Sequence, residues 1–303
     1  MSVERKFKMA LDETRMLMLG SQILFGFEFN AVFQQSFEQL PTSSRWIDGT
    51  GLSLMVLAVA LLIAPGTQHR LTCDGQITPR LDHAATVFAG WALLPFAISL
   101  GLDIYVVLQR DFGVGIGIAA GAFFTALALL FWYGLEVGYT KLVLKNSPMG
   151  TPPEEKPTPL QVRIDQMLTE ARVAIPGAQA LLGFQLLVAM SEVFSKLPPS
   201  SQRVHALALG CIALALVLLV APAAFHRLAF RGDDTEDVFR VGSALVTSAL
   251  FPLALGISGD IYVALARIAD SPGIGTAAAI VSLLLFLTFW YVQPLLLRNR
   301  AHP

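Results

Sequence analysis

Acidic and amide side chains inside apolar segments are the residues of this sequence most able to do chemistry. Glu28 follows Arg15 by about 13 residues, or roughly 20 Å of helix, which places it near the centre of a bilayer if this segment crosses one. A carboxylate at that depth costs at least about 2.5 kcal/mol, so it must face protein or water, or be protonated. A candidate ion or proton path therefore comprises Glu28, Gln35, Gln185 and Glu192. A buried, hydrogen-bonded packing face accounts for the same residues.

An Asp and an Arg recur together at the end of another apolar segment. The stretch LDIYVVLQR returns later in the chain as GDIYVALAR. In a helix, the Asp and the Arg of each copy share a face and stand about 10.5 Å apart. Their position near the outer surface predicts either a charged vestibule or a set of interfacial anchors. The residues concerned are Asp103, Arg110, Asp260 and Arg267.

A third set of charged residues lies at the opposite ends of the apolar segments. It comprises Glu13, Arg15, His69, Arg70, Glu170, Arg172, His226 and Arg227. We expect a structural collar of salt bridges at the cytoplasmic surface. Two facing histidines could hold a haem, but the adjacent arginines suit lipid phosphates better. No cofactor or metal is therefore expected, and the absence of a nucleophile–base constellation or phosphate loop argues against an enzyme.

The elements that must position these residues are long apolar segments. The chain is 54% hydrophobic and 14% charged, whereas soluble domains carry about 25% charged residues. The net charge of −1 gives no indication of a nucleic-acid partner. Segments of about 20 residues with almost no charge predict membrane-crossing helices, because an open sheet would leave edge amides unpaired in lipid. They are 16–37, 50–68, 84–102, 112–135, 173–193, 206–225, 241–259 and 271–297.

The fold class predicted is therefore all-α, a polytopic membrane protein with eight transmembrane helices and the lipid bilayer as its solvent. The distribution of Lys and Arg sets the orientation. Most of the 21 Lys and Arg residues fall on one side if the N-terminus is cytoplasmic. The excess predicts that both termini face the cytoplasm, in a bacterial inner membrane. Those on the other side are Arg45, Arg110, Lys196, Arg203 and Arg267.

The second half of the chain repeats the first. APGTQHR returns as APAAFHR, and LPF…DIY as FPL…DIY, at nearly constant spacing. Four helices per half predict two parallel repeats, inserted the same way up. The expected organisation is a cytoplasmic amphipathic segment (1–14), a first repeat (15–140), a Pro-rich cytoplasmic linker (141–166), a second repeat (167–298) and a cytoplasmic tail (299–303).

These motifs, together with ETR…LGSQILFGF and its second copy EAR…IPGAQALLGF, carry a family resemblance. The chain resembles a family of small four-helix bacterial membrane proteins of unknown function, here as a fused pair. The resemblance covers both halves and implies the fold and the membrane location.

Two classes of function remain open from the sequence. Glu28 and the mid-segment prolines Pro95 and Pro252, which remove helical hydrogen bonds, favour a proton- or cation-coupled transporter or an ion-conducting protein. The scarcity of charge within the apolar segments favours a non-transporting scaffold or accessory subunit. A second copy of the chain or another subunit of a membrane complex is the partner to consider in either case.

Overall fold

The computed structural model describes residues 3–72, 79–134, 158–228, 230 and 233–301, which contain helices and no strand. The first half consists of α1 (Val3–Ala31), the 3-10 helix η1 (Gln35–Gln39), α2 (Thr42–Leu71), α3 (Pro79–Phe112), α4 (Val114–Leu129) and the π-helical turn η2 (Leu130–Gly134). The second half consists of α6 (Leu160–Ala189), α7 (Glu192–Ser195), α8 (Pro199–Leu228), α9 (Glu236–Ile268), α10 (Pro272–Leu287), the π-helical turn η4 (Thr288–Val292) and α11 (Gln293–Ala301).

Seven segments of these helices, among the described residues, are long and apolar enough to cross a membrane. They are Thr42–Leu71, Ala84–Arg110, Val114–Tyr133, Leu160–Ala189, Pro199–Arg227, Glu236–Ile268 and Pro272–Arg298. The all-helical class is thus confirmed, whereas the expected number of eight spans is not. The first expected span, 16–37, is the one missing. Its helix α1 ends at Ala31 and includes Gln22, Glu28 and Asn30.

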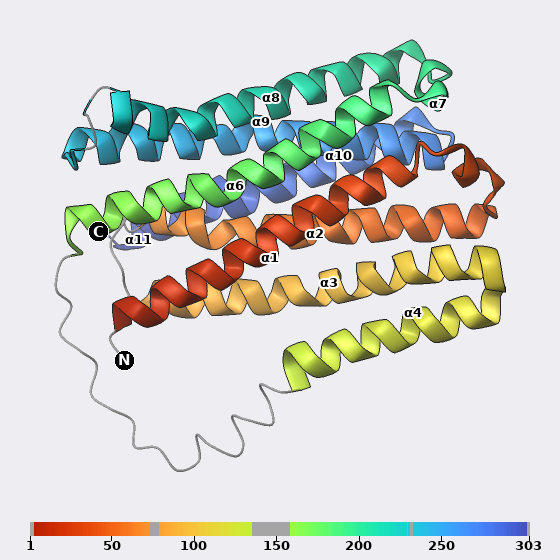
Figure 1. Cartoon of the computed structure of the whole chain (residues 1–303), viewed down its shortest axis with the longest axis horizontal. Coiled ribbons are helices and arrows are strands. Elements are labelled where there is room, and N and C mark those ends of the chain that lie inside the picture. The colour runs from red at the N-terminus through yellow and green to blue at the C-terminus, as the bar shows by residue number, and fades with distance from the viewer. Residues whose placement is uncertain (1–2, 73–78, 135–157, 229, 231–232, 302–303) are drawn as a thin grey trace.

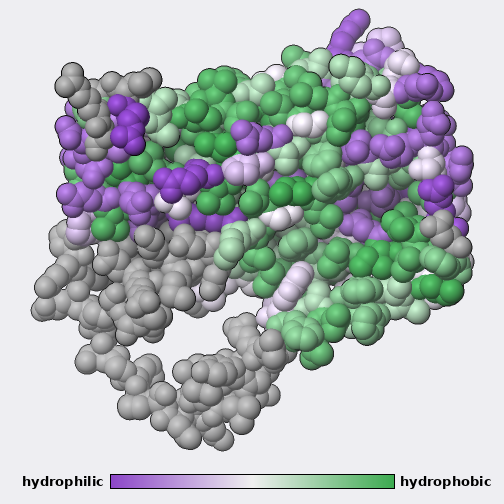
Figure 2. All heavy atoms as spheres, viewed as in Figure 1, coloured by the Kyte–Doolittle hydropathy of each residue, from purple (hydrophilic) through white to green (hydrophobic). Residues whose placement is uncertain are grey.

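The helices run alternately between the two ends of one elongated bundle. In Figure 1, α1, α3, α6 and α9 run away from the end that carries both termini, and α2, α4, α8 and α10 run back. We call the end with the termini the terminal end and the opposite end, where α1 ends and α2 begins, the distal end. Figure 2 shows hydrophobic side chains over most of the middle of the bundle and hydrophilic ones gathered at both ends. This distribution suits a protein that crosses a bilayer along its long axis.

Helix α2 occupies the centre of the bundle. It packs against α1 and α3 of its own half and against α9, α10 and η4 of the other. Trp290 of η4 is fully buried and donates its indole N–H to the Ala60 carbonyl oxygen at 2.9 Å. The equivalent helix of the second half, α8, instead exposes Leu207, Leu214 and Val217. The two halves therefore share a helix order but differ in how they are covered.

The structure adds detail to three expectations about the helices. Pro95 and Pro252 are buried and lie within α3 and α9, which continue past the position where each proline removes a backbone hydrogen bond. Helix α6 begins at Leu160, inside the expected linker (141–166), and continues through the expected start of the second repeat at 167. The expected segment 1–14 is likewise continuous with α1 from Val3 onwards. Pro159 stands at the N-cap of α6, where its missing N–H removes no hydrogen bond from the helix.

Candidate functional site

Three carboxyl groups from three helices line one cavity of about 300 Å³ near the distal end. They belong to Glu28 in the last turn of α1, Asp48 in the second turn of α2 and Asp103 in α3. Glu28 is only 4% exposed and Asp48 only 6%, while Asp103 is partly buried. We call this the carboxyl cavity. Acidic groups brought together under cover of three helices are expensive unless something neutralises them.

Ser99 of α3 connects one of these carboxyl groups to the backbone of α2. Its hydroxyl oxygen lies 2.9 Å from Glu28 Oε1 and 2.9 Å from the Gly51 carbonyl oxygen. A hydroxyl has one hydrogen, so it can donate to only one of these two acceptors at a time. A protonated Glu28 resolves the conflict, because it donates to Ser99 while Ser99 donates to Gly51. The geometry therefore fits a neutral Glu28 and permits an ionised one.

One oxygen of each carboxyl group is buried without a hydrogen-bond donor among the described residues: Glu28 Oε2, Asp48 Oδ2 and Asp103 Oδ2. The carboxyl groups of Glu28 and Asp103 lie close enough to form a hydrogen bond if one of them carries a proton. Leaving a buried polar group unsatisfied costs about 1–3 kcal/mol, and more for a charged one. Gly51 of α2 lies beside this cluster, since a Cβ there would stand 3.4 Å from both Asp103 Oδ1 and Ser99 Oγ. Carboxyl oxygens of this kind can accept a proton, a hydrogen bond from water or the positive charge of a cation.

The second half has a different cluster at the equivalent positions. Gln185 stands where the first half has Glu28, His205 where it has Asp48, and Asp260 at the repeat of Asp103. The Gln185 amide nitrogen lies 2.9 Å from each Asp260 carboxyl oxygen, and all three side chains are buried. His205 Nε2 lies 2.9 Å from the Gln185 carbonyl oxygen, and its Nδ1 lies 3.8 Å from Asp260 Oδ1. The single carboxyl of this cluster therefore has partners within the protein.

The structure regroups the residues expected from the sequence. Glu28 was expected in a central path and Asp103 in an outer vestibule, but both line the same cavity. Gln185, also expected in the path, binds Asp260 of its own half. Glu28 also lies near the distal end, because α1 ends at Ala31, and not midway along the bundle. Sequence reasoning missed Asp48, which precedes the apolar segment 50–68. The repeat could have revealed Asp48, because the equivalent residue of the second half, His205, is also polar and directly precedes the apolar segment 206–225.

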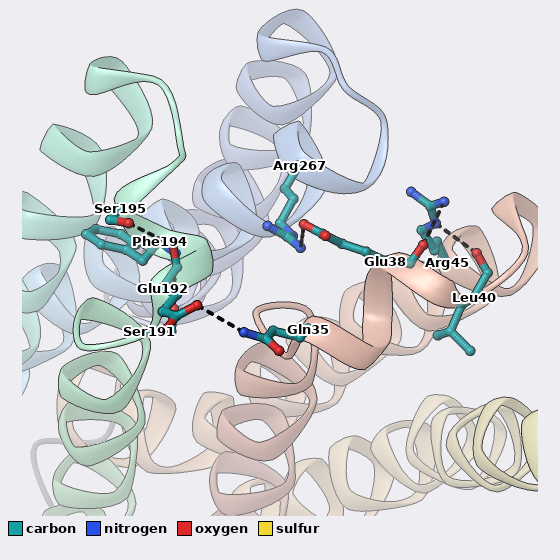
Figure 3. Close-up of polar contacts among 9 residues, drawn as sticks. All are labelled: Gln35, Glu38, Leu40, Arg45, Ser191, Glu192, Phe194, Ser195 and Arg267. Carbon is teal, nitrogen blue, oxygen red and sulfur yellow. Dashed lines mark hydrogen bonds and ion pairs between the residues drawn. The ribbon is translucent and has the colours of Figure 1, made fainter.

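The other distal residues join the two halves at the surface (Figure 3). Gln35 donates to Glu192 Oε2 at 3.1 Å, so these two residues form a surface pair and not part of a path. Arg267 reaches across to Glu38 Oε1 at 3.1 Å instead of pairing with Asp260. Arg110, the equivalent of Arg267, is exposed and lines the carboxyl cavity.

At the terminal end, one buried ionic cluster joins α6 to the first half. Glu170 forms an ion pair with Arg70, lies 3.7 Å from Arg15 Nη2 and stands 3.5 Å from His69 Nδ1. This cluster thus brings together four of the eight residues expected in the collar, three from the first half and Glu170 from the second. Three of the other four are arranged differently. Arg172 and Arg227 are exposed, His226 pairs with Asp234 at 3.3 Å, and the side chain of Glu13 lies outside the described residues.

A bundle of long apolar helices that encloses charged groups defines a multi-pass membrane protein. The chain belongs to DUF6328, a family of unknown function, whose model matches residues 2–136 and 154–294. The family model thus matches once in each half, as expected of a tandem duplication. No curated protein and no solved structure matches the chain.

Proposed function

We propose that the protein is a proton-coupled membrane transporter and that the carboxyl cavity holds the coupling proton. The observation that carries this proposal is the position of Ser99 between Glu28 and Gly51, at 2.9 Å from each. This arrangement serves both protonation states of Glu28, since Ser99 accepts from the neutral acid and donates to the carboxylate. A group that must gain and lose a proton during each transport cycle needs partners for both states.

The membrane topology is part of the same proposal. We infer that α1 is an eighth crossing helix, inserted with α6 the same way up, and that both termini are cytoplasmic in a bacterial inner membrane. The common direction of α1 and α6 supports this topology, as does the excess of Lys and Arg at the terminal end. The carboxyl cavity then lies toward the outer face, near the end of α1 and the start of α2.

A non-transporting scaffold or accessory subunit is the second candidate function. The cluster of Gln185, His205 and Asp260 favours it. At these positions of the second half, the buried carboxyl group of Asp260 is hydrogen-bonded to another side chain of the protein, as in a purely structural contact. If both clusters served only to fix helices, neither would exchange protons with the solvent. The protonation of Glu28 therefore distinguishes the two candidates.

Infrared difference spectroscopy of the purified protein during a pH titration tests the proposal. We expect the carbonyl band of a protonated carboxyl to disappear as the pH rises, and to be missing in Glu28→Gln. Glu192→Gln is the matched control, because Glu192 is an exposed carboxyl at the same end, outside the cavity. A spectrum without any titrating carboxyl that depends on Glu28 would refute the proton site. Transport itself is measured with the protein reconstituted in liposomes, as the movement of protons across the membrane that a gradient of the transported solute drives. Glu28→Gln should abolish this proton movement.

A further inference from the structure

We propose that the carboxyl cavity takes a monovalent organic cation with an apolar body, such as a hydrophobic ammonium ion, in exchange for its proton. This inference rests on the proposed function and names the class of substrate. It follows from the walls of the cavity, from its opening and from the number and state of its acidic groups.

The walls of the carboxyl cavity are mainly apolar, although its base is acidic. Hydrophobic side chains from α1, η1, the η1–α2 connection and α3 surround the carboxyl groups, and only Gln34, Ser36 and Arg110 add further polar atoms. The apolar residues are Leu24, Phe27, Ala31, Phe37, Leu40, Val106 and Val107. A volume of about 300 Å³ lies at the small end of the range for pockets that hold organic ligands. Apolar walls would contribute nothing to binding a hydrated inorganic ion.

The cavity opens onto the apolar side of the bundle. Phe27 is 56% exposed and Val107 is 60% exposed, and both line the cavity. In a membrane these side chains face the acyl chains, whereas Gln34 and Arg110 lie at the polar distal end. A ligand can therefore reach the carboxyl groups from the lipid, which suits an amphiphile that partitions into the bilayer.

The acidic groups are arranged for one diffuse positive charge. Glu28 and Asp48 are each more than nine-tenths buried and line the cavity, and each has one oxygen without a hydrogen-bond donor among the described residues. Yet no three His, Cys, Asp or Glu side chains in the described part of the chain come close enough to hold a metal ion. Metal ions need several oxygen ligands at 2.0–2.6 Å, whereas an alkylammonium ion tolerates carboxylates spread around its surface.

Aromatic rings in the same wall add a second attraction. Phe27 and Phe37 both line the cavity, and Phe27 is held in place by Phe184 of α6, with ring centroids 4.5 Å apart. Aromatic faces attract quaternary ammonium ions by about 0.5–2 kcal/mol each. Carboxylates and aromatic rings together are the usual recognition elements for such cations.

Proton release balances the charge when the cation binds. The neutral Glu28 that fits the present geometry loses its proton to the solvent, and the resulting carboxylate then faces the ligand's positive charge. Ser99 stabilises this state by donating to Glu28, 2.9 Å away. No bond of the ligand is made or broken. In the second half the Gln185 amide already occupies Asp260, so we assign the exchange to the first half alone.

Isothermal titration calorimetry of the full chain in lipid nanodiscs tests this inference. The ligand is benzyltrimethylammonium, compared with its uncharged isostere neopentylbenzene and with the anion benzenesulfonate. Repeating the titration in buffers of different ionisation enthalpy counts the protons released. We expect saturable binding of the cation alone, with release of up to one proton. We also expect binding at least tenfold weaker in Glu28→Gln and in Asp48→Asn, and unchanged in Glu192→Gln.

The outcomes separate this inference from the proposed function. If Glu28 titrates in the infrared spectrum but the cation does not bind, the substrate class is wrong and the proton site stands. Equal binding of the uncharged isostere, or undiminished binding in both carboxyl variants, would show simple partition into an apolar space and also overturn the inference. If no carboxyl titrates, the proposed function fails, and binding without proton release would overturn the exchange.

Discussion

The amide of Gln185 lies 2.9 Å from each carboxyl oxygen of Asp260, at the positions where the first half has Glu28 and Asp103. Two exchanges, Gln185 for Glu28 and His205 for Asp48, thus separate a cluster with internal partners from one with unpaired oxygens. The two copies of this polar site therefore differ in their hydrogen bonding. Variants of one copy can therefore be compared with those of the other in the same molecule.

Replacing Gln185 by Leu should destabilise the protein, because Asp260 would keep its burial and lose its amide donor. Leaving a buried carboxyl without its hydrogen bond costs about 1–3 kcal/mol, or more if it stays charged. Thermal unfolding in detergent should show a clearly lower midpoint for Gln185→Leu. The double variant Gln185→Leu with Asp260→Leu should recover part of the loss, because the unpaired carboxyl is then gone. Strictly additive losses would contradict the pairing.

The contact between α1 and α6 allows a prediction with a control built into the repeat. A Cβ at Gly26 would overlap the ring of Phe184, whereas the equivalent Gly183 has no atom within 4 Å of such a Cβ. Gly26→Ala should therefore lower the unfolding temperature. Gly183→Ala should leave it unchanged or raise it slightly, since alanine favours a helix by about 1 kcal/mol over glycine. The two thermal midpoints, measured side by side, check this, and equal behaviour of both variants would argue against the packing.

Glu170 should be the most sensitive charged residue at the terminal end. It is 8% exposed and is the acidic partner of Arg15 and Arg70, both buried. Removing one partner of a buried ion pair costs about 3–5 kcal/mol, because the remaining charge stays buried. Glu170→Gln should strongly reduce the yield of folded protein. Glu236→Gln is the control, because Glu236 is 70% exposed, although it also lies 3.6 Å from an arginine, Arg163.

The sequence predicts much of the fold and only part of the candidate site. A helix that crosses the hydrocarbon core of a bilayer must be long and almost uncharged, so composition alone predicts seven of the expected segments. The motif shared by Glu13–Arg15 and Glu170–Arg172 indicates the duplication. Composition does not predict which polar residues contact each other, because those contacts depend on how each helix is rotated about its own axis. Glu28 and Asp103 come from separate segments and carry no local signal that they face each other.

The sequence motifs likewise do not predict that the two halves make different contacts. Equivalent motifs predict equivalent neighbours, yet Trp290 donates to Ala60 of the other half, while Trp132 packs on Phe96 of its own. The contact that each tryptophan makes depends on which helices pack against α2. That packing is the sum of many small contacts across the whole bundle, which local motifs do not determine. Repeats fix the order of the helices but not the interface between the two copies.

The position of α1 relative to the membrane gives the last prediction. If α1 crosses, the N-terminus and the segment around Pro41 lie on opposite sides, although α1 is not among the seven segments apolar enough to be recognised. Its polar residues can still be accommodated, because Gln22 and Glu28 are buried against other helices and not exposed to lipid. Single cysteines at the exposed positions Ser43 and Val114, in a background lacking Cys73 and Cys211, should react with a membrane-impermeant maleimide added outside intact cells. A cysteine at Ser2 should react only after the cells are opened; labelling of Ser2 and Ser43 positions from the same side would mean that α1 does not cross.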